Sequence, residues 1–191
     1  TTGEGGAVTT NDPRVDETAR RLRIFGINKD SASFSPEFSD LHGYGWYFEV
    51  AELGYKYYLN DIGAAIGMVQ LARLEETNAR RRLLARRYSA GLASVPWVDT
   101  RTDREYVLNA SHMYVIATPH RDRLHVHLRD HGIATGVHYL PAQHHPLYRD
   151  YPAVVPVTDR VWLRLLTLPL YPDLTEADVD YVVSTIRNFQ P

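Results

Sequence analysis

The chain has 191 residues, 44% of them apolar and 23% charged, with a formal net charge of −2. This length and composition suit a soluble globular protein of one domain, or of one domain with part of another. The near-neutral charge argues against nucleic acid or an anionic membrane as a partner, and no apolar run is long enough to span a bilayer. The absence of cysteine excludes disulfides and thiolate chemistry and is compatible with a cytoplasmic location.

Lysine is rare in this chain. Only Lys29 and Lys56 stand among the 21 basic residues, and the others are arginine. Any mechanism that needs an amine nucleophile therefore has two candidates within these residues.

The first thirty residues carry a glycine-rich start and one periodic segment. Residues 1–6 are glycine-rich, and the β-branched run at residues 7–10 predicts a strand. A glycine-rich turn beside a strand can cradle a phosphate, but neither the dinucleotide-binding nor the P-loop spacing is present, so a plain turn is the simpler interpretation. Apolar residues at helical spacing predict a helix over residues 12–26 that ends at Gly26.

An irregular, aromatic segment follows. Residues 31–45 have the serine, glycine and aromatic composition of a surface loop, and Trp46, Tyr47 and Phe48 come directly after them. These three rings could form a stacking wall for a flat ligand or a dimer contact, or they could pack the loop onto its own domain. The composition does not decide between these alternatives.

A long helix is predicted from Ile62 onward, with Asn60 or Asp61 as its N-cap. Its first half is apolar on every side, which predicts that it is buried all round. Gly63 and Gly67 lie on one side of it, where a neighbouring backbone could approach closely. Its second half is rich in arginine; it could bind an anionic partner, but it fits better a solvated face with Glu–Arg pairs at helical spacing.

The last hundred residues alternate between strand and helix patterns. Strands are predicted over residues 113–118 and 133–139, a short extended piece over residues 167–170, and a helix over residues 121–131 that Gly132 ends. This pattern is that of a compact α/β unit.

A capping box is predicted near the C-terminus. Thr175 precedes Asp178 by three residues, with Asp in place of the usual Glu or Gln. The helix that it opens should bury the apolar residues Val179, Val182, Val183, Ile186 and Phe189.

Nine histidines raise the question of a metal site. His127 and His131 are four residues apart on a predicted helix, as in helical zinc sites, but no Glu follows His127 and cysteine is absent. His125 and His127 would leave a helix on different faces. No serine lies in a nucleophile elbow. We therefore expect neither a metal nor a nucleophilic triad.

Several segments together carry a resemblance to a known family. They are TTGEGGAVTTND (1–12), ELGYKYYLNDIGAAIGMVQLARLE (52–75), RRRLLARRYSAGL (80–92), HGIATGVHYLP (131–141), HPLYRD (145–150) and LTLPLYPDLTEADVDYVV (166–183). In this order they resemble the sugar-nucleotide aminotransferases of the DegT/StrS type, which are pyridoxal 5'-phosphate (PLP) enzymes with the aspartate-aminotransferase fold. The ordered set extends almost from end to end of the chain.

The resemblance implies an α/β protein with the PLP-dependent transferase fold, of which this chain would be the C-terminal part. Residues 1–60 would belong to the large PLP-binding domain, with its interface loop, and residues 61–191 to a linking helix and the small C-terminal domain. The Schiff-base lysine of the family lies just ahead of the TTGEGG segment, so it is expected before Thr1. Neither Lys29 nor Lys56 matches that position, and the chain alone is expected to be inactive.

The reaction implied by the resemblance is transamination. An amino-acid donor, typically glutamate, would pass its amino group through PLP to a keto-sugar nucleotide in amino-sugar biosynthesis. Family members are homodimers whose active sites are shared at the subunit interface. The expected partners are therefore a second subunit, the N-terminal remainder of the enzyme and the two substrates.

The resemblance also implies cofactor contacts in the GYKYYLND segment, which in the family reaches into the neighbouring subunit's site near the PLP phosphate. Lys56 would be a phosphate partner, because an ammonium on a flexible stem suits that group; the alternative is a solvent-exposed loop lysine. Tyr58 stands where relatives often carry Asn or Arg, and its phenol can still donate a hydrogen bond.

Substrate contacts are expected elsewhere. His138 and Tyr139 match a family position near the sugar nucleotide, although adjacent strand residues face opposite ways and one of them could pack inward. Trp46 is a further candidate for substrate binding. Gln143 stands where many relatives have a histidine, with two histidines just after it, so the residue that takes this role stays open.

Two other functions compete with this hypothesis. The chain could be a non-catalytic binding or dimerisation module that kept the fold, or part of a PLP aminotransferase that acts on a non-sugar ketone. As a C-terminal part without its partner surface, it is also expected to oligomerise or to bind a hydrophobic dye.

Overall fold

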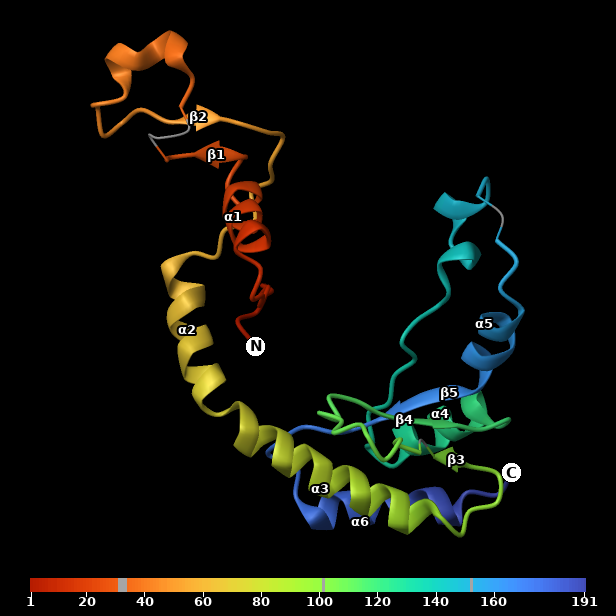
Figure 1. Ribbon diagram of the computed structural model, residues 1–191. Helices are drawn as coiled ribbons and strands as arrows, with labels where there is room; N and C mark the ends of the chain where they lie inside the picture. The colour runs from red at the N-terminus through yellow and green to blue at the C-terminus, as the bar shows by residue number, and fades with distance from the viewer. Residues whose placement is uncertain (31–33, 101, 152) are drawn as a thin grey trace. The chain divides into compact units, whose positions relative to one another are not determined.

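The chain folds as two units, Thr1–Ala72 and Arg73–Pro191 (Figure 1). The computed structural model describes residues 1–30, 34–100, 102–151 and 153–191. The domain division expected from the resemblance, at residues 60 and 61, stays a prediction.

The first unit begins with a capped helix and a strand pair. Helix α1, Pro13–Leu22, starts where the Asp12 side chain accepts a hydrogen bond from the Arg14 backbone N–H at 2.9 Å, with proline at its first position. This confirms the helix predicted there. Strand β1, Ile27–Asn28, then pairs antiparallel with β2, Glu49–Val50.

Two glycines let the chain cross itself at close range beside this strand pair. Gly26 has φ +70°, and a Cβ on it would lie 1.9 Å from the Glu52 carbonyl oxygen. A Cβ on Gly54 would lie 1.9 Å from the Gly26 nitrogen. The Ala51 N–H donates to the Gly26 carbonyl at 3.0 Å and closes the crossing. Only glycine fits either position. Helix α1 itself ends at Leu22, before the stop predicted at Gly26.

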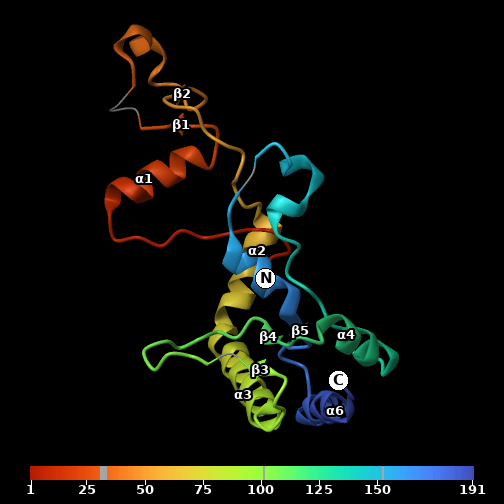
Figure 2. The same cartoon turned by 90° about the vertical axis from the view of Figure 1, so that its right-hand side faces the viewer.

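Helix α2, Asp61–Ala72, is capped by Asn60, whose Oδ1 accepts a hydrogen bond from the Gly63 N–H at 2.8 Å. The predicted close approach on its glycine side is present. A Cβ on Gly67 would lie 3.2 Å from Cγ2 of Thr2, so the glycine-rich N-terminal segment packs here (Figure 2).

The prediction that this apolar helix is buried all round is wrong for this chain. Gly63 is the one buried residue of α2, whereas Ile62 and Met68 are 76% and 74% exposed. Among the described residues of its unit, the N-terminal segment contacts α2 on its glycine side, whereas its large apolar side chains stay exposed. The predicted continuous helix is also interrupted: Arg73 has φ −98° and ψ 0°, and α3, Leu74–Leu92, begins after it.

The second unit is built on a three-stranded antiparallel sheet in the order β3-β4-β5. The strands are β3, Asp99–Thr100, β4, Tyr114–Ala117, and β5, Leu165–Leu168. Tyr114 pairs with Leu168 and Ala117 with Leu165. The strand predicted over residues 113–118 is thereby confirmed, and β5 overlaps the extended piece predicted at residues 167–170.

Three helices close the core of this unit: α3, α4, Arg121–Asp130, and α6, Glu176–Asn188. Helices α3 and α6 lie side by side (Figures 1 and 2). The fully buried side chains include Leu84, Tyr88, Leu92, Ile116, Leu124, Leu128, Leu166, Leu168, Val179 and Ile186. Because these residues come from α3, α4 and α6 and from strands β4 and β5, burial of their apolar surface holds the unit together. The end of α4 is as predicted, since Gly132 takes φ +74° directly after it.

The start of α6 confirms the predicted capping box. Thr175 Oγ1 accepts from the Asp178 N–H at 3.1 Å, and the Asp178 carboxylate accepts from the Thr175 N–H at 2.9 Å. The Thr175 hydroxyl, which lies 2.6 Å from the same carboxylate, and then the Thr175 N–H hold the pKa of Asp178 below its ordinary value. The five apolar positions predicted for this helix are buried.

The arginine-rich half of the long helix pairs differently from the prediction. Arg87 donates to Asp180 and to Glu176, each at 2.6 Å, and Arg80 lies 3.5 Å from Glu176. The observed pairs therefore join α3 to α6 instead of lying along α3. The hydrogen bond from Arg87 lowers the pKa of Asp180.

Two predicted strands are absent. Residues 7–10 have no strand partner among the described residues and stay irregular, because a β-branched run needs a neighbour to form a ladder. Residues 133–139 make one isolated bridge, between Gly136 and Thr167, instead of a strand. After it come the 3-10 turns η3, Ala142–His144, and η4, Pro146–Tyr148, then helix α5, Pro156–Val161, and the turn η5, Trp162–Arg164.

Among the described residues, no helix combines the length and the apolar character needed to cross a membrane.

Candidate functional site

The Lys56 segment is held in an extended conformation by backbone hydrogen bonds. The Tyr55 N–H donates to the Leu22 carbonyl at 2.7 Å, and the Tyr57 N–H donates to the Arg23 carbonyl at 2.8 Å. The Tyr55 and Tyr57 rings stack at 4.8 Å with an interplanar angle of 4°. Because side chains alternate along an extended segment, Lys56 points to the face opposite this pair.

Lys56 and Tyr58 are both exposed in this unit. The Lys56 ammonium makes no hydrogen bond or ion pair with the described residues, so its charge is available to a ligand. An ammonium and a phenolic hydroxyl two residues apart are donors suited to a phosphate group. The residues present therefore fit the phosphate of PLP, which is the contact that the resemblance implies.

The aromatic loop before this segment has an internal core. The Phe34, His42 and Tyr47 rings contact one another at centroid distances of 5.1–5.6 Å, around the turn η2, Pro36–Leu41. The Glu49 carboxylate accepts hydrogen bonds from the Tyr47 hydroxyl and from the Ser35 N–H, each at 2.8 Å. Burial and then the Glu49 carboxylate raise the pKa of Tyr47.

Trp46 lies on the outside of this loop. It is 64% exposed and stacks on Tyr44 at 5.8 Å, while Tyr47 belongs to the internal core. Tyr47 therefore packs the loop onto itself, and Trp46 presents an open face. A contact of Trp46 with a ligand or a second subunit stays a prediction. Residues 31–33 of the predicted loop lie outside the described residues.

In the second unit, His138 and Tyr139 lie together at the surface. Their rings meet edge to face at 4.8 Å, and Tyr139 is 76% exposed. Their separation onto opposite faces does not occur, because the segment is not part of a strand; the peptide bond between them is cis. The His138 Nδ1 lies 2.8 Å from Thr167 Oγ1.

Thr167 was not singled out from the sequence. It lies on β5 between two buried leucines, Leu166 and Leu168, so its side chain faces away from the core. A polar residue alternating with core leucines was the available signal, but its partner is 29 residues away in the chain.

Gln143 and His144 share one partner. Gln143 Nε2 donates to Asp159 Oδ1 at 2.9 Å, and His144 Nε2 lies 3.2 Å from the same oxygen. Both residues therefore tie η3 to α5.

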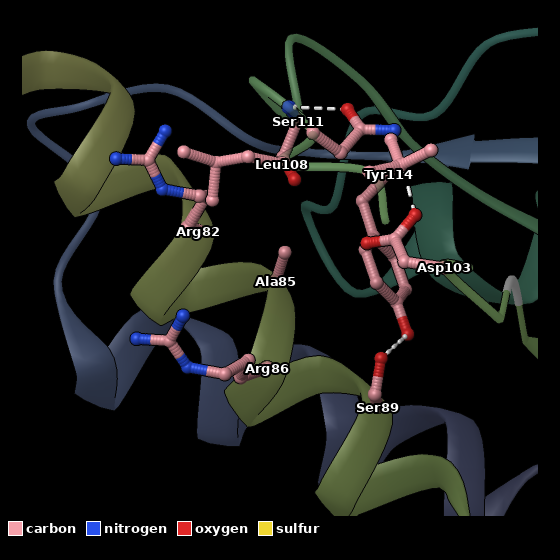
Figure 3. A pocket seen from close by; sticks show the side chains of 10 residues that line it. Arg82, Ala85, Arg86, Ser89, Asp103, Leu108, Ser111 and Tyr114 are labelled. Atoms are coloured by element: carbon pink, nitrogen blue, oxygen red, sulfur yellow. Dashed lines mark hydrogen bonds between the residues drawn. The ribbon is translucent and has the colours of Figure 1, made fainter. Parts of the chain in front are cut away.

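A recess of about 180 Å³ opens between α3 and residues 103–111 of the second unit. Figure 3 shows Arg82 and Arg86 projecting from α3 on one side, with Tyr114 and Asp103 on the other. The Tyr114 hydroxyl lies 2.8 Å from Ser89 Oγ. None of the site residues predicted from the sequence lines this recess.

The histidines form no metal site that the described residues reveal. His127 and His131 have ring centroids 4.4 Å apart, but His127 Nε2 lies 3.2 Å from the Thr185 carbonyl and His131 Nδ1 lies 2.7 Å from the His127 carbonyl. No group of three or more potential ligands occurs within the ranges that the structure describes.

Comparison with known proteins gives the family. Residues 1–187 match the model of the DegT/DnrJ/EryC1/StrS aminotransferase family, and the chain belongs to that family. The resemblance stated from the sequence is therefore confirmed.

Two sequenced or solved relatives illustrate the match. Uncharacterized protein MJ1066 of Methanocaldococcus jannaschii is 35% identical over 203 residues, which cover 98% of this chain and 50% of that protein. The sugar aminotransferase CalS13 from Micromonospora echinospora has a TM-score of 0.83 and 32% identity, over 98% of this chain and 48% of that one. The chain thus spans about half the length of the curated relative it matches.

A third relative carries chemical information. DesV of S. venezuelae, solved in complex with a ketimine intermediate, has a TM-score of 0.79 and 27% identity, over 93% of this chain and 44% of that one. These likenesses confirm the predicted fold class, that of the PLP-dependent sugar aminotransferases. The family implies a PLP or PMP cofactor.

Proposed function

We propose that this chain supplies the C-terminal part of a PLP-dependent aminotransferase that moves an amino group from glutamate to a keto-sugar nucleotide. The observation that carries the proposal is the family match over residues 1–187. The likeness to the sugar aminotransferase CalS13 supports a sugar acceptor.

Neither lysine of this chain is the Schiff-base lysine in this proposal. Lys56 lies in a segment paired with the end of α1, and Lys29 follows β1. We assign the Schiff-base lysine to the N-terminal remainder of the enzyme, so that the 191 residues alone are inactive.

The cofactor, when bound, supplies the electron sink for transamination. Lys56 and Tyr58 bind its phosphate in the neighbouring subunit of a homodimer with shared active sites. The exposed ammonium of Lys56 provides the charge, and the Tyr58 hydroxyl provides a second donor.

Three residues of this chain are assigned to the acceptor. His138 and Tyr139 contact the sugar nucleotide through an imidazole nitrogen and an exposed ring. Trp46 offers a flat, open face on which a ring of the substrate can stack.

The decisive experiment uses the complete enzyme, incubated with PLP, glutamate and a panel of keto-sugar nucleotides and simple ketones. We expect an absorbance band near the edge of the visible range that responds to glutamate, and an aminated sugar nucleotide as product. Replacing Lys29 and Lys56 together should leave the imine band. Loss of the band in that double variant, persisting at PLP concentrations that saturate its binding, would place the Schiff-base lysine within this chain.

Two other outcomes decide the alternatives. Amination of simple ketones with no sugar product would assign the enzyme to a non-sugar acceptor. Failure to bind PLP or to respond to glutamate would favour the non-catalytic module.

A further inference from the structure

The imidazole of His138 is held by two residues, Thr167 and Gly136, to which the sequence assigned no role. Its Nδ1 lies 2.8 Å from Thr167 Oγ1, and its ring lies over Gly136. We propose that Thr167 is a positioning residue, which orients His138 so that Nε2 faces the acceptor substrate, with Gly136 as the floor beneath the ring. This inference rests on the proposed function for the identity of the acceptor.

Thr167 is a rigid anchor. Its N–H donates to the Gly136 carbonyl at 2.7 Å, its carbonyl accepts from the Gly136 N–H at 3.1 Å, and on the other edge of β5 it pairs with Val115. Threonine is β-branched, so its side-chain torsion is restricted as well. The position of Oγ1 is therefore determined by the sheet and not by the exposed segment that carries His138.

Gly136 sets the height of the ring. A Cβ at this position would lie 2.9 Å from Cε1 of His138, closer than such contacts occur. Any larger residue would therefore displace the imidazole. The backbone bridge between Gly136 and Thr167 holds these two residues in one fixed arrangement beside the His138 ring.

The hydrogen bond leaves one ring nitrogen for a ligand. Whichever partner donates, Nδ1 is engaged by Thr167, and Nε2 makes no hydrogen bond with the described residues. The Tyr139 ring stands edge-on at 4.8 Å and restricts rotation on the other side. Nε2 is thus presented to the acceptor, a polar sugar nucleotide, without reorganisation at binding.

The test compares Thr167→Val and Thr167→Ser in the complete enzyme. Valine keeps the shape of the strand residue and removes the hydroxyl, so we expect KM for the keto-sugar nucleotide to rise about 5- to 10-fold, the effect of one hydrogen bond. The half-reaction with glutamate should be unchanged, since the acceptor takes no part in it. Serine should restore KM to within about 2-fold.

The chain offers a matched control. His125 Nδ1 lies 2.7 Å from Thr135 Oγ1, which makes a second histidine–threonine pair in the same unit. Thr135→Val should leave KM unchanged. In a His138→Ala background, Thr167→Val should have no further effect; an undiminished effect there would overturn the proposal.

Two further measurements keep the proposal testable if a variant misfolds or if the proposed function is wrong. If Thr167→Val does not fold, Gly136→Ala serves in its place and should also raise KM for the keto-sugar nucleotide. An unchanged KM in Gly136→Ala would contradict the role of Gly136 beneath the His138 ring. The ¹⁵N NMR shift of His138 Nδ1 should change in Thr167→Val, because the hydroxyl that contacts this nitrogen is lost. An enzyme that aminates no sugar nucleotide defeats the proposed function, while identical ring shifts in the two proteins defeat the positioning role.

Discussion

Lys56 lies in an extended segment whose backbone is fixed on both sides of it, while its own side chain is open to solvent. Such an arrangement suits a residue that contacts a ligand from a defined position. Lys29, the other lysine, is also exposed but follows a two-residue strand. The pair therefore offers a comparison at constant net charge.

We expect Lys56→Gln to weaken PLP binding by the complete enzyme about 10-fold, because a hydrogen bond to a charged phosphate is lost. Cofactor titration followed by absorbance measures the effect. Lys29→Gln is the control and should bind PLP as the wild type does. Equal affinities of all three proteins would remove Lys56 from the cofactor site.

Gly54 is a second position where a single residue decides local structure. Gly54→Ala would place a methyl group 1.9 Å from the Gly26 nitrogen, and the backbone must then separate. We expect the first unit to lose about 3 kcal/mol of unfolding free energy, as for severe overpacking. Urea unfolding measures this loss. The control is Gly45→Ala, where a Cβ would meet nothing within 4 Å; a similar loss there would contradict the explanation.

At the scale of elements, α3 and α6 are joined by charges as well as by the core. Arg87 reaches two carboxylates of α6, on Glu176 and Asp180. Because the folded-state pKa of Asp180 lies below its ordinary value of 3.8, its contribution to stability is complete above that value. It is lost as the pH falls through the lower, folded-state pKa.

We therefore expect Arg87→Gln to lower the melting temperature at neutral pH and to lower it progressively less as the pH falls below 3.8. Thermal unfolding between pH 7 and about pH 2.5 follows this difference. Arg86→Gln, on an exposed position of the same helix, is the control and should show no such dependence. A difference that is constant with pH would exclude the ion pair as its cause.

On the scale of the whole molecule, helix α2 carries large apolar side chains that the described residues leave exposed. Five of its large apolar side chains are exposed: Ile62, Ile66, Met68, Val69 and Leu71. An apolar patch of this kind marks a surface that another protein surface covers. In the proposed enzyme, that cover comes from the N-terminal remainder and the second subunit.

We expect the 191-residue chain to bind a hydrophobic dye or to self-associate, and the complete enzyme to do so far less. Dye fluorescence with light scattering measures both properties. Met68→Glu should reduce dye binding at least about 2-fold, because it places a charge in the middle of the patch. Val154→Glu changes an exposed apolar residue outside α2 and is the control. A monodisperse chain that binds no dye would contradict this prediction.

Much of the fold could be predicted from local patterns. Helices α1, α4 and α6 and strands β4 and β5 follow from apolar periodicity and from capping residues, which act within a few residues of one another. The strand predicted at residues 133–139 failed because pairing depends on a distant neighbour, and Gly136 alone reaches β5. The Glu–Arg pairs predicted along the long helix failed for the same reason. Arg87 pairs instead with residues of α6 that are about 90 residues away in the chain.

The candidate site divides in the same way. Lys56, Tyr58, His138 and Tyr139 were predicted from the resemblance to the family and Trp46 from its aromatic loop, and their roles stay predictions. The sequence by itself determined the family and fold class, because an ordered set of motifs can be recognised along the chain without knowing which residues are in contact. Only the tertiary structure brought Thr167 and Gly136 to His138 and left α2 exposed. Hydrogen bonds across a sheet edge and burial by a neighbour depend on distances in space, which spacing along the chain does not specify.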